Sequence, residues 1–213
     1  MKLKIFDVVE LNDKNRATIL NINNKEYLAE VVNSAGISLG NKVIKDNDIN
    51  NTFIDEITDN YQYDIDITID NNKYKYSGKK LGNNMSITRI VGTKEEYFYQ
   101  MNDKYYILDT KGNYILTTAE DIYPYIEYRY LNINNIKQFI KLGTKNDTVY
   151  SVKVSDIVLN NNSADTITLT VNEEDKNILI DYTNLFKIDN SNINKAEVNI
   201  KYSNINSINS LEE

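Results

Sequence analysis

The chain contains no cysteine and no histidine among its 213 residues. Their absence excludes disulfide bonds, thiolate nucleophiles, catalytic triads that use histidine, and zinc sites built from cysteine or histidine. Tryptophan is also missing and proline occurs once, whereas asparagine, isoleucine, lysine and tyrosine are abundant, which is typical of AT-rich bacterial genomes. We therefore expect a protein that is not an enzyme and that needs no cofactor or metal.

A basic surface and a membrane segment are also lacking. The net charge is −7, and residues 1–54 hold seven basic and seven acidic residues, so the excess negative charge lies in the remainder. Neither part has the basic face that nucleic acid or anionic lipid requires. The first residues, MKLKIFDVVELND, lack the apolar run of a signal peptide, and no segment approaches the ~18 apolar residues of a membrane span. We expect no nucleic-acid partner, no membrane insertion and a cytoplasmic location, or an exported protein if Met1 replaces a removed signal.

Alternation with a period of two residues is the strongest pattern that the sequence does contain. In YDIDITID (residues 63–70), tyrosine and isoleucine alternate with acidic residues and threonine, which predicts a strand. Asn71 and Asn72 then favour a two-residue hairpin turn, because asparagine tolerates positive φ. This turn would place Ile69 opposite Tyr74 in the following strand, KYKYSGK.

Further short strands follow, separated by turn-like polar segments, so antiparallel neighbours are expected. We predict them at residues 85–91, 96–101, 105–109, 114–118, 125–131, 148–159, 165–171, 177–182 and 196–205. Residues 133–143 are the best helix candidate, with Asn132 as N-cap and Gly143 as a C-terminal stop. A second helix is predicted within residues 46–58, where isoleucine and phenylalanine recur at helical spacing.

The first quarter of the chain forms a unit with its own pattern. FDVVELNDKNRATILNINNKEYLAEVVNSAGISLGNKVIKDNDI contains four or five short strands joined by polar turns. This segment resembles small SH3-like barrel domains of the DUF4926 type, which open with a "DVV.L" strand. The resemblance implies a small β-barrel at residues 1–54.

The remainder resembles a different family. KYKYSGKKLGNNMSITRIVGTKEEYFYQMNDKYYILD and NLFKIDNSNINKAEVNIKYSNIN look like the curved antiparallel sheets of LolA/LppX-type lipoprotein domains common in Firmicutes. In that family a half-barrel is closed by short helices over an apolar cavity for acyl chains. The resemblance implies a curved sheet at residues 57–213 with one or two helices, and a hydrophobic concavity lined by Tyr97, Tyr99, Tyr106 and Tyr128. The expected fold class is therefore mostly β.

Residues 95–114, EEYFYQMNDKYYILDTKGNY, hold the densest group of aromatic residues. Apolar side chains here occupy both alternating sets of positions, unlike in residues 63–70, so both faces of the sheet are expected to be partly buried. The cover could be the 133–143 helix, another domain, a partner or a lipophilic ligand. For any one of these tyrosines, core and cross-strand packing is the favoured explanation, because tyrosine combines an apolar ring with a polar tip.

Acidic clusters give weaker indications. Asp64, Asp66, Thr68 and Asp70 lack the glycine and glutamate of a calcium-binding EF-hand loop, and their alternation indicates a solvated strand face. The acidic pair at 95–96 and the acidic cluster at 173–175 are the candidates for glycoside hydrolysis, which requires two carboxylates at a defined separation.

These observations lead to three hypotheses. The first is a non-enzymatic binding protein that holds a protein partner or a lipophilic molecule on the concave aromatic face. The second is an accessory protein in which the barrel docks a partner and the sheet is a spacer. The third and least favoured is a carboxylate-based hydrolase, an enzyme that uses only carboxylates and tyrosine.

Overall fold

The computed structural model describes residues 3–24, 26–50 and 52–211 and separates into two compact units, residues 1–52 and residues 53–213. Each unit has its own hydrophobic core. Strands dominate both units, so the protein is mostly β, as the alternating sequence pattern predicts.

The first unit is a four-stranded antiparallel sheet in the order β1-β2-β3-β4. Its strands are β1 (Val8–Glu10), β2 (Arg16–Asn23), β3 (Glu26–Val32) and β4 (Ser38–Lys45), and a short 3-10 helix, η1 (Asp46–Asp48), follows them. Ala17 and Ile19 of β2 and Ala29 and Val31 of β3 are fully buried. One face of this sheet therefore carries the small core.

The closed SH3-like barrel expected at residues 1–54 does not form. Among the described residues, β4 forms a ladder only with β3, so the sheet stays open. The segment after β4 meets the end of β1 through an isolated bridge between Leu11 and Ile49, where the N–H of Asn50 donates to the Glu10 carbonyl at 2.8 Å. A barrel needs inward-facing apolar side chains along every strand, but Ile44 is the one buried residue of β4.

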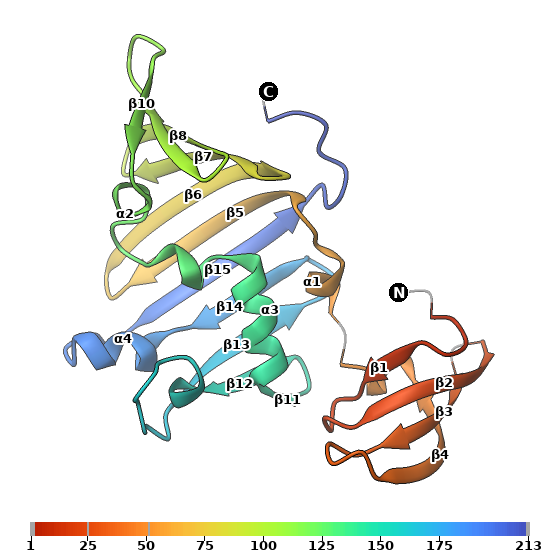
Figure 1. Ribbon diagram of the computed structural model, residues 1–213. Coiled ribbons are helices and arrows are strands. Elements are labelled where there is room, and N and C mark those ends of the chain that lie inside the picture. The colour runs from red at the N-terminus through yellow and green to blue at the C-terminus, as the bar shows by residue number, and fades with distance from the viewer. Residues whose placement is uncertain (1–2, 25, 51, 212–213) are drawn as a thin grey trace. The chain divides into compact units, whose positions relative to one another are not determined.

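The second unit is built on one antiparallel sheet of eleven strands, in the order β10-β9-β8-β7-β6-β5-β15-β14-β13-β12-β11. The strands are β5 (Asn60–Ile69), β6 (Asn72–Leu81), β7 (Asn84–Val91), β8 (Lys94–Met101), β9 (Lys104–Leu108), β10 (Tyr114–Thr117), β11 (Thr144–Asn146), β12 (Val149–Lys153), β13 (Thr166–Asn172), β14 (Asn177–Asp181) and β15 (Ala196–Ser203). The last strand, β15, lies between β5 and β14 and joins two groups of sequential strands into one sheet (Figure 1).

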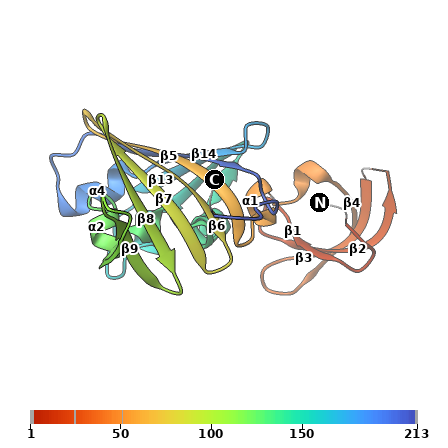
Figure 2. The ribbon, with the colours of Figure 1, turned by 90° about the horizontal axis from the view of Figure 1, so that it is seen from above.

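Four α-helices lie on the same face of this sheet: α1 (Phe53–Glu56), α2 (Ala119–Ile122), α3 (Ile133–Leu142) and α4 (Thr183–Asp189). Each helix contributes at least one buried residue to a single core cluster. The side chains on one face of the sheet belong to the same cluster. Figure 1 shows α2, α3 and α4 in front of the sheet, and Figure 2 shows the sheet curving over them. We call this the helix-covered face, and the opposite one the open face.

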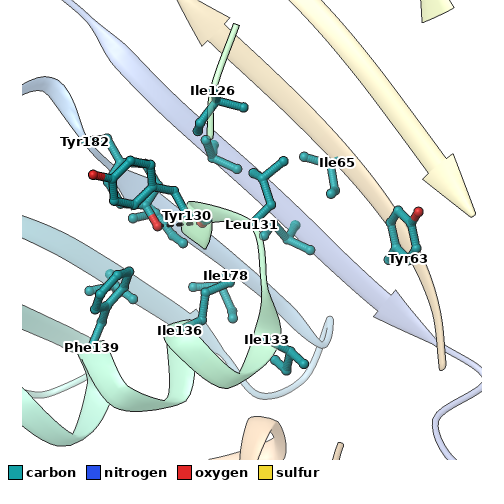
Figure 3. Packing of buried hydrophobic residues seen from close by; sticks show 14 of the residues in the cluster. Tyr63, Ile65, Ile126, Tyr130, Leu131, Ile133, Ile136, Phe139, Ile178 and Tyr182 are labelled. Atoms are coloured by element: carbon teal, nitrogen blue, oxygen red, sulfur yellow. Dashed lines mark hydrogen bonds between the residues drawn. The ribbon is translucent and has the colours of Figure 1, made fainter. Parts of the chain in front are cut away.

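Helix α3 confirms the prediction for residues 133–143. Asn132 caps it, because its side-chain oxygen accepts the backbone N–H of Asn134 at 2.9 Å, and the helix ends before Gly143. Its apolar stripe, which includes Ile136 and Phe139, is buried against the sheet. Figure 3 shows Ile136 and Phe139 of this helix with Ile178 of β14 among the side chains of the core.

The β5–β6 hairpin forms as predicted, but its register differs by two residues. Ile67, not Ile69, lies opposite Tyr74, and Asp70 with the next residue makes the turn. Asp70 has a φ of 51°. Its carboxylate accepts the N–H of Lys195 at 3.1 Å and its own N–H donates to the Lys195 carbonyl at 2.8 Å, which holds it outside the ladder. A shift of two residues leaves every side chain on its predicted face.

The strand predicted at residues 125–131 is wrong. This segment contains a 3-10 helix, η2 (Tyr128–Tyr130). Its buried residues, Ile126, Tyr130 and Leu131, do not follow the two-residue period of a strand. The strand predicted at 148–159 is likewise shorter, because it turns into a 3-10 helix, η3 (Val154–Asp156).

The fold predicts a large difference between two substitutions on α3. Ile136→Ala should lower the free energy of unfolding by about 2 to 5 kcal/mol, because the side chain is fully buried and leaves a cavity. Leu142→Ala on the same helix should change it by less than about 0.5 kcal/mol, because Leu142 is exposed. Urea denaturation followed by circular dichroism measures both, and equal effects would contradict the packing of α3 described above.

Candidate functional site

The open face of the eleven-stranded sheet is polar over its centre. Acidic, basic and threonine side chains alternate there on β5, β6, β13 and β15, and Asp66 forms an ion pair with Lys75 at 3.3 Å. This confirms that the acidic residues of 63–70 form a solvated strand face. The composition of the open face changes toward β8, β9 and β10.

Toward this edge the open face becomes aromatic and aliphatic. The register places Tyr99 opposite Tyr106, and Tyr106 opposite Leu116 on the next strand. Tyr97 and Tyr114 share the face, and the rings of Tyr99 and Tyr114 meet edge to face with their centroids 5.2 Å apart. We call the group formed by Tyr97, Tyr99, Tyr106, Leu108, Tyr114 and Leu116 the tyrosine patch.

The tyrosine patch remains accessible. Tyr114 is 53% exposed and Leu116 is 67% exposed, while Tyr99 and Tyr106 are half-buried by their neighbours in the patch. The four helices lie on the other face, as the core cluster that they share with the sheet shows. Within residues 53–211, therefore, no helix covers the patch.

The structure brings together three of the four predicted site residues. Tyr97, Tyr99 and Tyr106 belong to the patch, whereas Tyr128 lies in η2 on the helix-covered face, with its ring stacked on Tyr123 at 5.2 Å. The four residues therefore line no common concavity. Sequence reasoning missed Tyr114 as a site residue, although the alternation in YILTT already places it on one face with Leu116.

The space beneath the helices is filled by side chains. Tyr61, Tyr63, Tyr123, Tyr128 and Tyr202 surround a residual space of only about 10 Å³. A single water molecule needs roughly 10 to 15 Å³, so an acyl chain does not fit. The concavity implied for acyl chains is thus occupied by the protein's own tyrosines.

An open cleft of about 550 Å³ lies elsewhere on the helix-covered face, between residues 119–130 and residues 185–193. Its wall carries a polar cluster: the Arg129 guanidinium lies 4.7 Å from the centre of the Tyr130 ring and 2.9 Å from a Glu127 carboxylate oxygen. Glu120 and Asp189 add two more carboxylates. Apolar and aromatic side chains, among them Ile126, Leu185, Phe186 and Ile193, form most of the remaining lining.

Carboxylates of the acidic segments 95–96 and 173–175 bind groups within the protein. The Tyr97 hydroxyl donates a hydrogen bond to the Glu95 carboxylate at 2.5 Å. The next residue, Glu96, forms ion pairs with Arg89 and Lys94. Neighbouring strand residues point to opposite faces, so these two carboxylates lie on opposite sides of the sheet. Glu173 accepts the backbone N–H of Phe53 at 2.9 Å and so holds the start of α1.

The first unit has an apolar surface of its own. Phe6 is 75% exposed and adopts a φ of 73°, which is costly for a residue other than glycine. The N–H of Phe6 donates to the Ile19 carbonyl at 2.7 Å, which fixes this conformation. Ile5 and Val8 beside it are also exposed.

Neither a scan against models of protein families nor a search of curated proteins finds a match for this chain. Among the residues that the structure describes, no group of three or more acidic side chains is arranged to hold a metal ion. No described helix is both long and apolar enough to cross a membrane.

The buried tyrosines predict a loss of stability at high pH. Burial raises the pKa of Tyr76 and of Tyr128 to about 12, whereas tyrosine in an unfolded chain ionises near pH ~10. Because the folded pKa is the higher one, the stability from the protonated hydroxyls is complete below pH ~10 and is lost as the pH rises through about 12. Urea midpoints measured across this range should fall steadily. A midpoint that stays constant would show that these hydroxyls are not buried.

Proposed function

We propose that this chain is a non-enzymatic binding protein that holds a protein partner on the tyrosine patch. The observation that carries the proposal is the contrast between the two faces of β8–β10: Phe98 and Gln100 are buried under the helices, while the patch stays accessible. Clustered tyrosines on an accessible sheet face provide a large apolar contact area with polar tips, as protein interfaces commonly do.

The shape of the site favours a protein over a lipophilic small molecule. Small molecules bind in concave sites that enclose most of their surface, whereas the patch lies on a sheet face, and the open cleft of about 550 Å³ lies on the helix-covered face, away from the patch. A flat aromatic surface instead suits a partner that brings its own complementary surface. The patch also ends at β10, a strand with a neighbour on one side only.

Substitution of Tyr106 tests this proposal. Tyr106→Ser should change the free energy of unfolding by less than about 1 kcal/mol, because the side chain is only half-buried on the open face. Capture of partner protein from an extract of the source organism should nevertheless be lost. Tyr182→Ser is the matched control: Tyr182 is fully buried, so this variant should lose about 3 to 5 kcal/mol. If Tyr106→Ser destabilises the protein as much as Tyr182→Ser, the patch is structural and the proposal fails.

The first unit supports a second candidate function, in which residues 1–52 dock a partner and the large sheet is a spacer. The specific observation in its favour is the exposure of Phe6 at a strained backbone position, flanked by exposed Ile5 and Val8. A large apolar side chain held out in this way is unusual unless a partner contacts it.

Phe6→Ser distinguishes the two candidates. If the first unit docks the partner, this variant should lose capture while Tyr106→Ser retains it. If the tyrosine patch binds the partner, the results should be reversed. The fold should survive Phe6→Ser, because the ring is exposed and contributes little burial. Circular dichroism of the variant is the control for that assumption.

A further inference from the structure

Strand β10 is one of the two edges of the eleven-stranded sheet, and β11 is the other. Edge strands are usually protected from pairing with other chains by charged residues, proline or short length. The three residues of β11, Thr144–Asn146, include Lys145 and fit this description. The sequence of β10, YILT, contains no charged residue and no proline.

The backbone of β10 offers hydrogen-bonding groups at this edge. The N–H of Asp109 donates to the Asn113 carbonyl at 3.0 Å, and bonded pairs alternate along an antiparallel ladder. Ile115 and Thr117 consequently bond to β9, whereas the N–H and carbonyl groups of Tyr114 and Leu116 point away from it.

The side chains of β10 are exposed on both faces of the sheet. Tyr114 and Leu116 lie in the tyrosine patch, and Ile115, on the helix-covered face, is also exposed. An added strand would therefore satisfy the free backbone groups and bury apolar side chains on both faces at once.

We propose that a second copy of this chain pairs with β10 through its own β10, in antiparallel orientation. The outward groups of Tyr114 and Leu116 fix the register: Tyr114 of each copy lies opposite Leu116 of the other, and the two Ile115 residues face each other on the two-fold axis. This pairing forms four backbone hydrogen bonds. It rests on the proposed function, because it joins the tyrosine patches of two copies into one continuous surface on the open face.

Two features favour a second copy over an unrelated strand. First, the pairing is self-complementary, since each apolar side chain of β10 meets an apolar side chain and the interface is a two-fold one, the commonest kind in oligomers. Second, opposite charges come close together: in this register the turn that contains Lys111 approaches the segment of the other copy that contains Glu120. Among the described residues, neither side chain takes part in an ion pair within its own chain.

The absence of cysteine from the chain makes the register directly testable. Ile115→Cys places one thiol from each copy at a directly opposed, non-hydrogen-bonded pair, where the Cα atoms are about 4.5 Å apart and a disulfide can form. Leu116→Cys is the matched control. In the proposed register the cysteine of each copy lies opposite Tyr114 of the other, so the two thiols are two residues apart along the strands. Leu159→Cys reports random collision, since Leu159 is 91% exposed and lies outside the sheet.

Under mild oxidation, Ile115→Cys should form a disulfide-linked dimer at least about tenfold faster than either control, measured on non-reducing gels. Its formation at the rate of Leu159→Cys would overturn the proposal, and faster linkage of Leu116→Cys would overturn the register. Light scattering of the unmodified protein should give twice the chain mass of 24.7 kDa at high concentration. Leu116→Pro, which removes an outward N–H, should give the monomer mass, whereas Leu116→Ala should retain more dimer.

The failure of this inference is distinguishable from the failure of the proposed function. If Leu116→Pro and the unmodified chain are both monomers while Tyr106→Ser still loses the captured partner, self-pairing is wrong and the patch binds a different protein. If Ile115→Cys links rapidly but Tyr106→Ser captures partner normally, the pairing holds and the patch has another role.

Discussion

The burial of one face of β5 and β15 at the centre of the sheet is the constraint on which the second unit depends. Ile65, Ile67, Val198 and Ile200 alternate with polar residues on these two strands and are almost completely buried. Each such side chain contributes roughly 1.5 to 3 kcal/mol when it leaves water. Because a strand alternates strictly, this burial also forces the intervening acidic and basic residues onto the open face.

The same pairing joins the two ends of the second unit. Ile69 lies opposite Ala196, so strands more than a hundred residues apart in the chain form the middle of the sheet. The segments between them supply α2, α3 and α4, and these pack on the apolar face because it is the face that must be covered. Toward β8–β10 the helices still cover one face, but apolar residues occur on both, and the uncovered ones form the tyrosine patch.

Tyrosine serves two different purposes in this protein. Inside, two hydroxyls bind backbone acceptors: Tyr182 donates to the Tyr130 carbonyl at 2.7 Å and Tyr76 to the Ile122 carbonyl at 3.1 Å, whereas the buried Tyr150 hydroxyl has no partner among the described residues. A buried hydroxyl without such a partner would be costly. In the patch, by contrast, the rings of Tyr99 and Tyr106 contact the ring of Tyr114 edge to face, and part of each ring stays exposed to water. Residue type alone therefore does not separate core from surface, and the face of the strand decides.

The sequence by itself determined the elements whose signals are local. The period of two in residues 63–70 and the cap, stripe and stop of residues 132–143 predicted a strand and a helix that the structure confirms, because neighbouring residues fix these patterns. The density of tyrosines in 95–114 also located most of the candidate site. Only the tertiary structure decided the register at Asp70, which depends on Lys195, and the face on which Tyr97 and Tyr128 lie. These outcomes depend on contacts between distant segments, and no local pattern in the sequence records which of two apolar faces the helices will cover.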